Sequence, residues 1–166
     1  VSSAIRIGGD EFDEAIIKHV RSVHNLLIGK ETAENLKITI GNASPDKKIV
    51  KMEIMGRDAI TGLPRRLEVD SVEVRESLSE PTNSVVEEIK RNLGKTPPEL
   101  AADIIEHGIV MTGGGSLLKG LPKLIQDETG VPVIVAENPL LCVALGAGKF
   151  LERMRDNDRK YFNFRS

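Results

Sequence analysis

A run of three glycines and a serine, Gly113 to Ser116, constrains the fold of this chain more than any other feature. The apolar stretch 108–111 before it is typical of a short buried strand, and residues 117–129 after it favour a helix. Residues 131–135 are rich in β-branched side chains and predict another strand, while 139–153 predict a closing helix. The last third of the chain is therefore expected to be α/β.

The first part of the chain predicts a strand over residues 1–7, a glycine turn, and a helix that reaches about residue 27 with Asp10 as its N-cap. A shorter helix is expected over 31–37. The chain opens with Val1 rather than methionine, inside the predicted strand. We therefore expect it to be part of a longer protein, shortened by processing or by expression of a fragment.

The middle of the chain changes its hydrophobic period. Residues 49–55 and 66–69 alternate as strands around a turn at 61–64, and a long helix is expected over 72–93, broken or bent at Pro81. The resulting domain prediction is an α/β core formed by 1–35 and 96–151, a small α+β insertion at 36–95, and a tail at 152–166. We expect the polar segment 156–166 of this tail to be poorly ordered.

Composition excludes several classes of function. The 166 residues are 40% hydrophobic and 29% charged with a net charge of −2, so no nucleic-acid partner is expected. Cys142 is the only cysteine, which fits a reducing compartment and a buried apolar role. No apolar run approaches the roughly 18 to 20 residues of a membrane span, and no signal peptide is apparent. The sequence favours a cytoplasmic protein.

Two groups of residues are candidates for chemistry. The glycines at 113–115 let the backbone approach a ligand closely, although the spacing fits neither a Walker A loop nor a dinucleotide fingerprint, and a purely structural turn is the commoner alternative. Glu34 and Lys37 share a helix face, where an exposed ion pair worth about 0 to 1 kcal/mol is the simpler explanation. The turn at 8–10 is interpreted as structural. His19 and His24 are split across a helix, so a metal site is not predicted. No residue of this chain is predicted to be catalytic.

Several segments, taken together, resemble the MreB family of bacterial actin-like proteins. They match that family in order and spacing from residue 1 to about 151. The matching segments are 5–17, 25–29, Thr32-Ala33-Glu34 with Lys37 and Ile40-Gly41, 97–101, 110–118, 129–133 and Pro139-Leu140.

The resemblance implies one lobe of an actin-like ATPase fold, with a ribonuclease H-like sheet, helices and a small α+β insertion. In the complete protein, ATP with Mg²⁺ would lie between two lobes. The family's two phosphate-binding loops and its catalytic acid would lie upstream of this chain, which we expect to be inactive in hydrolysis by itself. The residues implied to bind the adenosine side are Ala33, Glu34, Asn35, Leu36, Lys37, Gly113, Gly114, Gly115 and Ser116.

The resemblance also implies a role. It predicts self-association into filaments, contact with the cell-wall elongation machinery, control of cell shape, and a place in the cytoplasm at the inner face of the membrane, reached mainly through the missing half. Two alternatives remain: a nucleotide-independent structural or interaction module, and the lobe of a sugar kinase or chaperone from the same superfamily.

Overall fold

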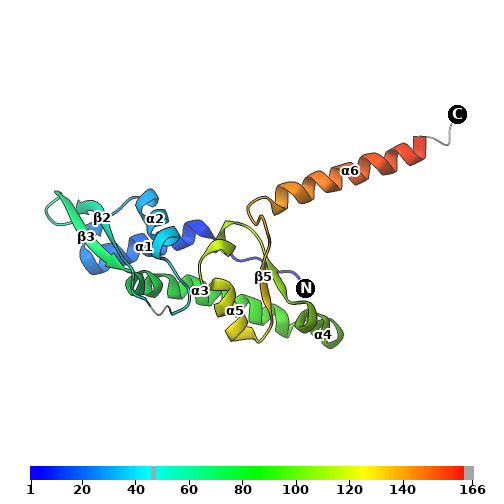
Figure 1. Cartoon of the computed structure of the whole chain (residues 1–166), viewed down its shortest axis with the longest axis horizontal. Helices are drawn as coiled ribbons and strands as arrows, with labels where there is room; N and C mark the ends of the chain where they lie inside the picture. The colour runs from blue at the N-terminus through cyan, green and yellow to red at the C-terminus, as the bar shows by residue number, and fades with distance from the viewer. Residues whose placement is uncertain (46–47, 163–166) are drawn as a thin grey trace.

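Two small sheets and six α-helices form an elongated body (Figure 1) in the described part of the chain. This computed structural model describes residues 1–45 and 48–162, with side chains as far as residue 154. The elements are α1 (Gly9–His24), β1 (Leu26–Leu27), α2 (Lys30–Ile40), β2 (Lys51–Asp58), β3 (Pro64–Asp70), α3 (Ser71–Gly94), α4 (Pro98–His107), β4 (Ile109–Met111), a 3₁₀ turn η1 (Gly114–Leu117), α5 (Leu121–Thr129), β5 (Val133–Val135) and α6 (Cys142–Phe162).

The predicted strand at residues 1–7 is wrong. No strand among the described residues pairs with this segment, and residues 1–6 are exposed. A strand forms only where its backbone N–H and C=O groups find a ladder partner, so alternation alone is insufficient. The cap prediction is also wrong: Gly8 is the N-cap of α1, and its N–H donates to Glu11 Oε2 at 2.8 Å, while Asp10 sits exposed in the first turn.

The first helix ends earlier than predicted because Asn25 adopts a left-handed conformation, with φ of 51°, and its N–H bonds Arg21 O at 3.0 Å. The chain then reverses, so Leu26 and Leu27 pair antiparallel with β2. Strands β2 and β3 form the predicted hairpin, with Ile54 opposite Leu67 and Met52 opposite Val69. Burial of Ile54 and Val69 fixes this register, because a one-residue slip would expose both side chains.

Pro81 does not break α3, which runs continuously from Ser71 to Gly94. Buried side chains lie on both sides of the proline, Leu78 before it and Val86 after it, and their packing holds one helical path. The hydroxyl of Thr82 donates to Leu78 O at 2.7 Å, adding a bond beside the proline, which has no N–H.

The last third is α/β as predicted, with β4 and β5 parallel and α5 connecting them. The closing helix differs at both ends from its prediction. It begins only at Cys142, and its backbone is helical to Phe162; the expected poor order of 156–162 stays a prediction, and the rest of the predicted tail, 163–166, lies outside the described residues. Figure 1 shows α6 extending away from the body.

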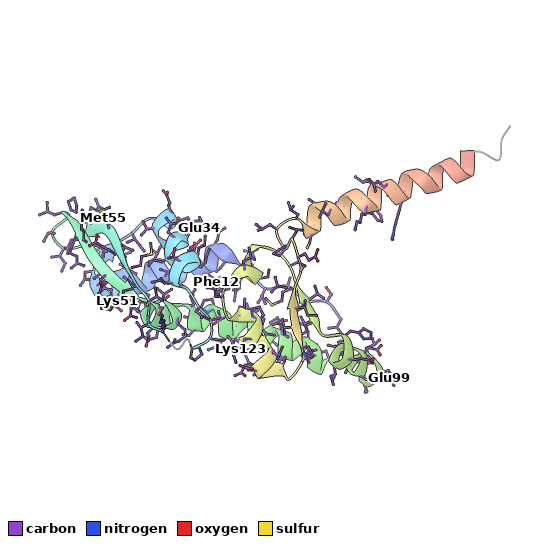
Figure 2. All side chains as sticks on the ribbon, in the orientation of Figure 1. Phe12, Glu34, Lys51, Met55, Glu99 and Lys123 are labelled. Carbon is purple, nitrogen blue, oxygen red and sulfur yellow. The ribbon has the colours of Figure 1, made fainter. Side chains whose placement is uncertain are left out.

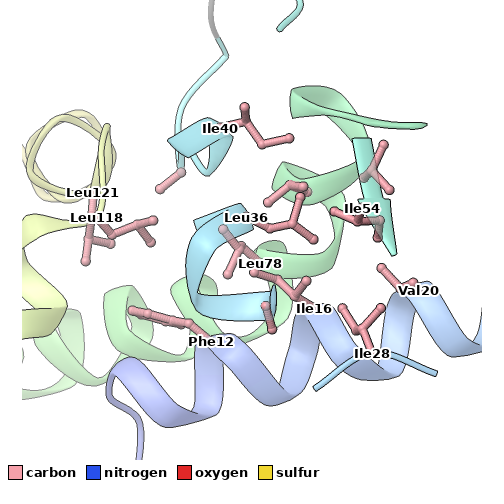
Figure 3. Close-up of a cluster of buried hydrophobic side chains, with 14 of the residues drawn as sticks. Phe12, Ile16, Val20, Ile28, Leu36, Ile40, Ile54, Leu78, Leu118 and Leu121 are labelled. Atoms are coloured by element: carbon pink, nitrogen blue, oxygen red, sulfur yellow. The ribbon is translucent and has the colours of Figure 1, made fainter. Parts of the chain in front are cut away.

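One apolar core joins the first three helices to the hairpin and to the start of α5. Phe12 and Ile16 of α1, Leu36 of α2 and Leu78 of α3 belong to one buried cluster (Figure 3), each exposed by 2% or less. Leu118 closes this core from the segment after the glycines. The core thereby fixes α1, α2 and the glycine-rich turn relative to each other, which positions the candidate site.

Candidate functional site

A cavity of about 610 Å³ opens between the start of α1, one face of α2 and the segment that follows β4. This volume lies in the range of small-molecule sites, roughly 300 to 1,000 Å³. It is lined by Gly9, Asp10, Phe12, Asp13, Glu34, Lys37, Ile38, Gly114, Gly115, Leu117, Leu118, Lys119 and Leu140.

A buried ion pair joins two walls of this cavity. Lys37 Nζ lies 2.8 Å from Asp13 Oδ1, with side-chain exposures of 15% and 7%, and it donates to Gly9 O at 3.1 Å. The carboxylate oxygen meets the distance of an ion pair without the alignment of a hydrogen bond. Helix α1 therefore turns Asp13 inward, toward α2. The pairing of Lys37 with Glu34 that helical spacing allows is not formed.

Glu34 is therefore left with its carboxylate at the cavity and no hydrogen bond or ion pair to any residue that the structure describes. Figure 2 labels Glu34 on α2 and Phe12 on the neighbouring α1. An ionised carboxylate only accepts hydrogen bonds, so this position suits a ligand that offers hydroxyl or amine donors.

The glycine-rich turn is built so that backbone forms the opposite wall. Gly113, with φ of 81° and ψ of 169°, adopts a conformation almost confined to glycine, and its N–H donates to Pro139 O at 2.8 Å. The Ser116 hydroxyl closes the turn by donating to Gly113 O at 2.7 Å. A Cβ on Gly115 would lie 3.9 Å from Phe12 Cε2, and one on Gly114 would lie 3.3 Å from Leu140 Cδ2. Side chains at these two positions would reduce the cavity.

The predicted site residues divide into those at the cavity and those that support it. Glu34, Lys37, Gly114 and Gly115 line the cavity. The side chains of Ala33 and Leu36 are fully buried in the core, so only their backbone could face a ligand. Gly113 and Ser116 shape the turn, and Asn35 is exposed outside the cavity lining.

Sequence reasoning missed the contribution of α1. Gly9 and Asp10, interpreted as structural, line the cavity, as do Phe12 and Asp13. The available signal was the glycine pair at a helix start, followed by a carboxylate one turn later. Lys119 and Leu140 gave no such signal, because their positions depend on how separate segments meet.

Other candidate residues have different surroundings from those expected. His19 and His24 are not split: their Nε2 atoms lie 3.5 and 2.5 Å from the same Glu73 Oε1. Within the described residues no group of three His, Cys, Asp or Glu could hold a metal ion.

Cys142 is only half-buried, because α6 leaves the body. None of the helices in the described chain is both long and apolar enough to cross a bilayer.

Comparison with known proteins identifies the family. The MreB/Mbl protein family model matches residues 1–159. The chain belongs to the MreB/Mbl family. The cell shape-determining protein MreB of Escherichia coli K12 is 50% identical over 151 residues, which make up 91% of this chain and 44% of that protein. Mbl of Bacillus subtilis 168 is 47% identical over 153 residues, covering 92% of this chain and 46% of the relative.

Solved structures place this MreB/Mbl chain in the actin-like fold. MreB 5 of Spiroplasma citri bound to AMPPNP superposes with a TM-score of 0.91 at 35% identity, covering 96% of this chain and 48% of that one. The MamK double helical filament superposes with a TM-score of 0.65 at 23% identity, covering 80% of this chain and 40% of the MamK chain. This is a likeness of fold alone. The chain spans less than half the length of these relatives.

Proposed function

We propose that this chain supplies the adenosine-binding side of the ATP site in an actin-like protein that forms filaments and determines cell shape. The observation that carries the proposal is the cavity itself, which is lined by Gly114 and Gly115 and by Glu34, whose carboxylate has no partner among the described residues. Its occupant in the family is suggested by the Spiroplasma citri relative, which has been solved with AMPPNP and with ADP.

The residues fit an adenosine group in chemical terms. A flat base needs a close, side-chain-free surface, which the two glycines offer, and ribose hydroxyls need an acceptor, which Glu34 offers. Lys37 is committed to Asp13 and Gly9, so its proposed role is to hold the wall that presents Glu34. Ala33, Asn35 and Leu36 would contribute through the same helix. Gly113 and Ser116 would fix the shape of the turn.

Phosphate and Mg²⁺ contacts are proposed to come from residues upstream of this chain. The bound Mg²⁺ would neutralise phosphate charge, and no residue of this chain is assigned to it. Consequently, we expect the chain by itself to bind nucleotide weakly and to have no ATPase activity.

Exposed apolar surface supports packing against a further lobe in the complete protein. Val110 and Ile134 face each other in register on β4 and β5, yet they are 63% and 55% exposed. Helix α6 carries further exposed apolar side chains at Val143, Phe150 and Leu151. A soluble domain that functioned alone would be expected to cover such surface. The division into a core at 1–35 and 96–151 and an insertion at 36–95 stays a proposal.

Self-association is proposed to use the hairpin. Its turn exposes Ile60 by 79% and Leu63 by 65%, and Met55 on β2 is 65% exposed. Apolar side chains at the tip of a projecting hairpin suit a contact with another subunit. Association with the cell-wall elongation machinery, and with the inner membrane surface through the rest of the protein, completes the proposed function.

The test is titration calorimetry with ATP and ADP in the presence of Mg²⁺. It compares this chain with a form extended upstream to the length of its relatives. Tight binding only by the extended form is expected, because the proposed phosphate contacts lie there. Equal binding by both forms would place the phosphate contacts within this chain and contradict the division of the site.

A nucleotide-independent interaction module is the second candidate. Its specific support is the exposed apolar surface, which provides docking area whether or not the cavity is filled. An extended form that binds neither ATP nor ADP, yet still self-associates, would favour it. Membership of the MreB/Mbl family argues against the sugar kinase and chaperone alternatives.

A further inference from the structure

A second, smaller hollow of about 70 Å³ lies where α2 ends and α3 begins, at the base of the β2–β3 hairpin. Its lining residues come from four separate segments, and Lys119 belongs to this hollow as well as to the large cavity. The lining consists of Thr39, Ile40, Gly41, Asn42, Lys48, Val50, Ser71, Arg75 and Lys119.

The charge of this hollow is one-sided. Among the described residues, its lining includes the cations Lys48, Arg75 and Lys119 and no carboxylate. Lys119 Nζ is accounted for, since it donates to Thr39 O at 2.9 Å at the carbonyl end of α2. Lys48 and Arg75 make no hydrogen bond or ion pair within the described residues. Glu76 lines a neighbouring hollow beside Arg75 without forming an ion pair with it.

Arg75 is the most informative of these cations. Its side chain is partly buried, and its guanidinium has no acceptor among the described residues. Guanidinium offers a planar set of N–H donors that matches the oxygens of phosphate or carboxylate. A ligand that supplied such oxygens would satisfy these donors.

The walls of the hollow are held by contacts that need no ligand. The Ala43 N–H donates to Lys119 O at 2.7 Å and the Ser44 hydroxyl donates to Gly120 O at 2.9 Å, which ties the end of α2 to the segment before α5. On the other side, Val50 N donates to Ser71 Oγ at 3.1 Å. Because this frame exists beforehand, little ordering would be required on binding.

We propose that this hollow binds a single phosphate-class oxyanion through Arg75 and Lys48, with Lys119 adding positive charge. Its volume is far below the roughly 300 to 1,000 Å³ of small-molecule sites, which suits one tetrahedral oxyanion and excludes a nucleotide. Such an anion would join the end of α2 to the start of α3 and stiffen the base of the hairpin. The proposal does not depend on nucleotide binding in the large cavity.

The test is a titration of the isotope-labelled chain with inorganic phosphate, followed by amide NMR at ionic strength held constant with sodium chloride. Saturable shifts are expected at Gly41, Asn42 and Ser71. Arg75→Gln should weaken phosphate binding by about tenfold or more, because a charge-assisted contact is lost. Arg57→Gln removes the same charge from an exposed strand position and should leave binding unchanged. Glu34→Ala should also leave it unchanged.

Three results would overturn the proposal: no shift beyond that of chloride, equal phosphate affinity for Arg75→Gln and the unaltered chain, or shifts centred on Gly114 and Gly115. Given phosphate binding, vesicles distinguish the source of the anion. A lipid headgroup would be assigned if the chain sediments with phosphatidylcholine vesicles that contain phosphatidic acid but not with phosphatidylcholine vesicles alone, and if Arg75→Gln abolishes this sedimentation. Phosphate binding without vesicle binding would assign a free phosphate.

Discussion

Lys37 reaches from α2 to α1, and its Nζ lies 2.8 Å from Asp13 Oδ1 in a setting that is almost closed to water. Removing one partner of such a pair leaves an uncompensated buried charge. Lys37→Ala is therefore expected to lower the free energy of unfolding by about 3 kcal/mol or more, measured by urea denaturation. In the extended protein it should also weaken ATP binding, since the wall that carries Glu34 would lose its tie.

The double variant Asp13→Asn with Lys37→Met separates charge from packing. It removes both charges, and it should be more stable than Lys37→Ala alone. Lys30→Ala serves as a control, because Lys30 lies 4.0 Å from Asp10 and both side chains are largely exposed. That change should have little effect on unfolding. A double variant no more stable than Lys37→Ala would show that the ion pair is not the cause.

Glu34→Ala is expected to weaken ATP binding by the extended protein by about 1 to 3 kcal/mol, because it removes the acceptor proposed for the ribose hydroxyls. Stability should change little, since Glu34 has no partner among the described residues. Calorimetry measures the first effect and thermal unfolding the second. Glu31→Ala, an exposed position on the same helix outside the cavity lining, is the matched control. Unchanged ATP affinity in Glu34→Ala would remove the adenosine assignment of α2.

Gly120 and Gly130 separate backbone strain from steric overlap. Both have φ above 70°, but a Cβ on Gly120 would overlap Asn42 Oδ1 and lie 2.7 Å from Ser44 N, whereas one on Gly130 meets nothing within 4 Å. Gly130→Ala should cost about 1 kcal/mol from its left-handed backbone. Gly120→Ala should cost about 3 kcal/mol or more, because overlap with fixed backbone is added. Equal losses of unfolding free energy for the two variants, measured by chemical denaturation, would contradict this packing around Gly120.

The hairpin turn is expected to depend on pH through Asp58. The N–H groups of Thr61 and Ile60 donate to Asp58 Oδ1 at 2.9 Å each and hold the pKa of Asp58 below its usual range. A carboxyl whose pKa is lower in the folded state stabilises the fold at pH values above its pKa in the unfolded chain. This stabilisation is lost as the pH falls through the pKa of the folded state. The Ile60 and Thr61 amide resonances should therefore shift below about pH 4.

Asp58→Asn supplies the comparison, because asparagine keeps an acceptor oxygen at that position and cannot titrate. The acid-induced shifts of the two amides should vanish in this variant. Shifts of the same size and midpoint in Asp58→Asn would assign the pH response to another group.

The hairpin tip provides a test of the proposed self-association. Ile60→Glu places a charge on a side chain that is 79% exposed, so it should not disturb the fold. In the extended protein it should reduce the polymer recovered by sedimentation, because a charge would be buried in the proposed subunit contact. Val23→Glu, at a 56% exposed position on α1, is the control. Equal sedimentation of Ile60→Glu and the unaltered protein would exclude the hairpin tip as a contact.

The sequence by itself determined the local elements whose signals are short-range. The hairpin around residues 61–64, the long helix after Asp70 and the strand–glycine–helix order of the last third all follow from periodicity, caps and turn residues. The family motifs directed attention to Glu34, Lys37, Gly114 and Gly115, which do line one cavity. For the remaining predicted residues, local pattern placed the helix and the turn without deciding which side chains line the cavity.

Tertiary structure decided the rest, because pairing and burial depend on residues far apart in the chain. Residues 1–7 alternate like a strand but have no ladder partner among the described residues, and α3 continues through Pro81 because core packing holds both sides. The partner of Lys37 is Asp13 from α1 rather than Glu34 one turn away, since burial between helices favours the closest opposite charge. That pairing leaves Glu34 at the cavity with no partner among the described residues, an outcome that depends on how α1 and α2 pack together.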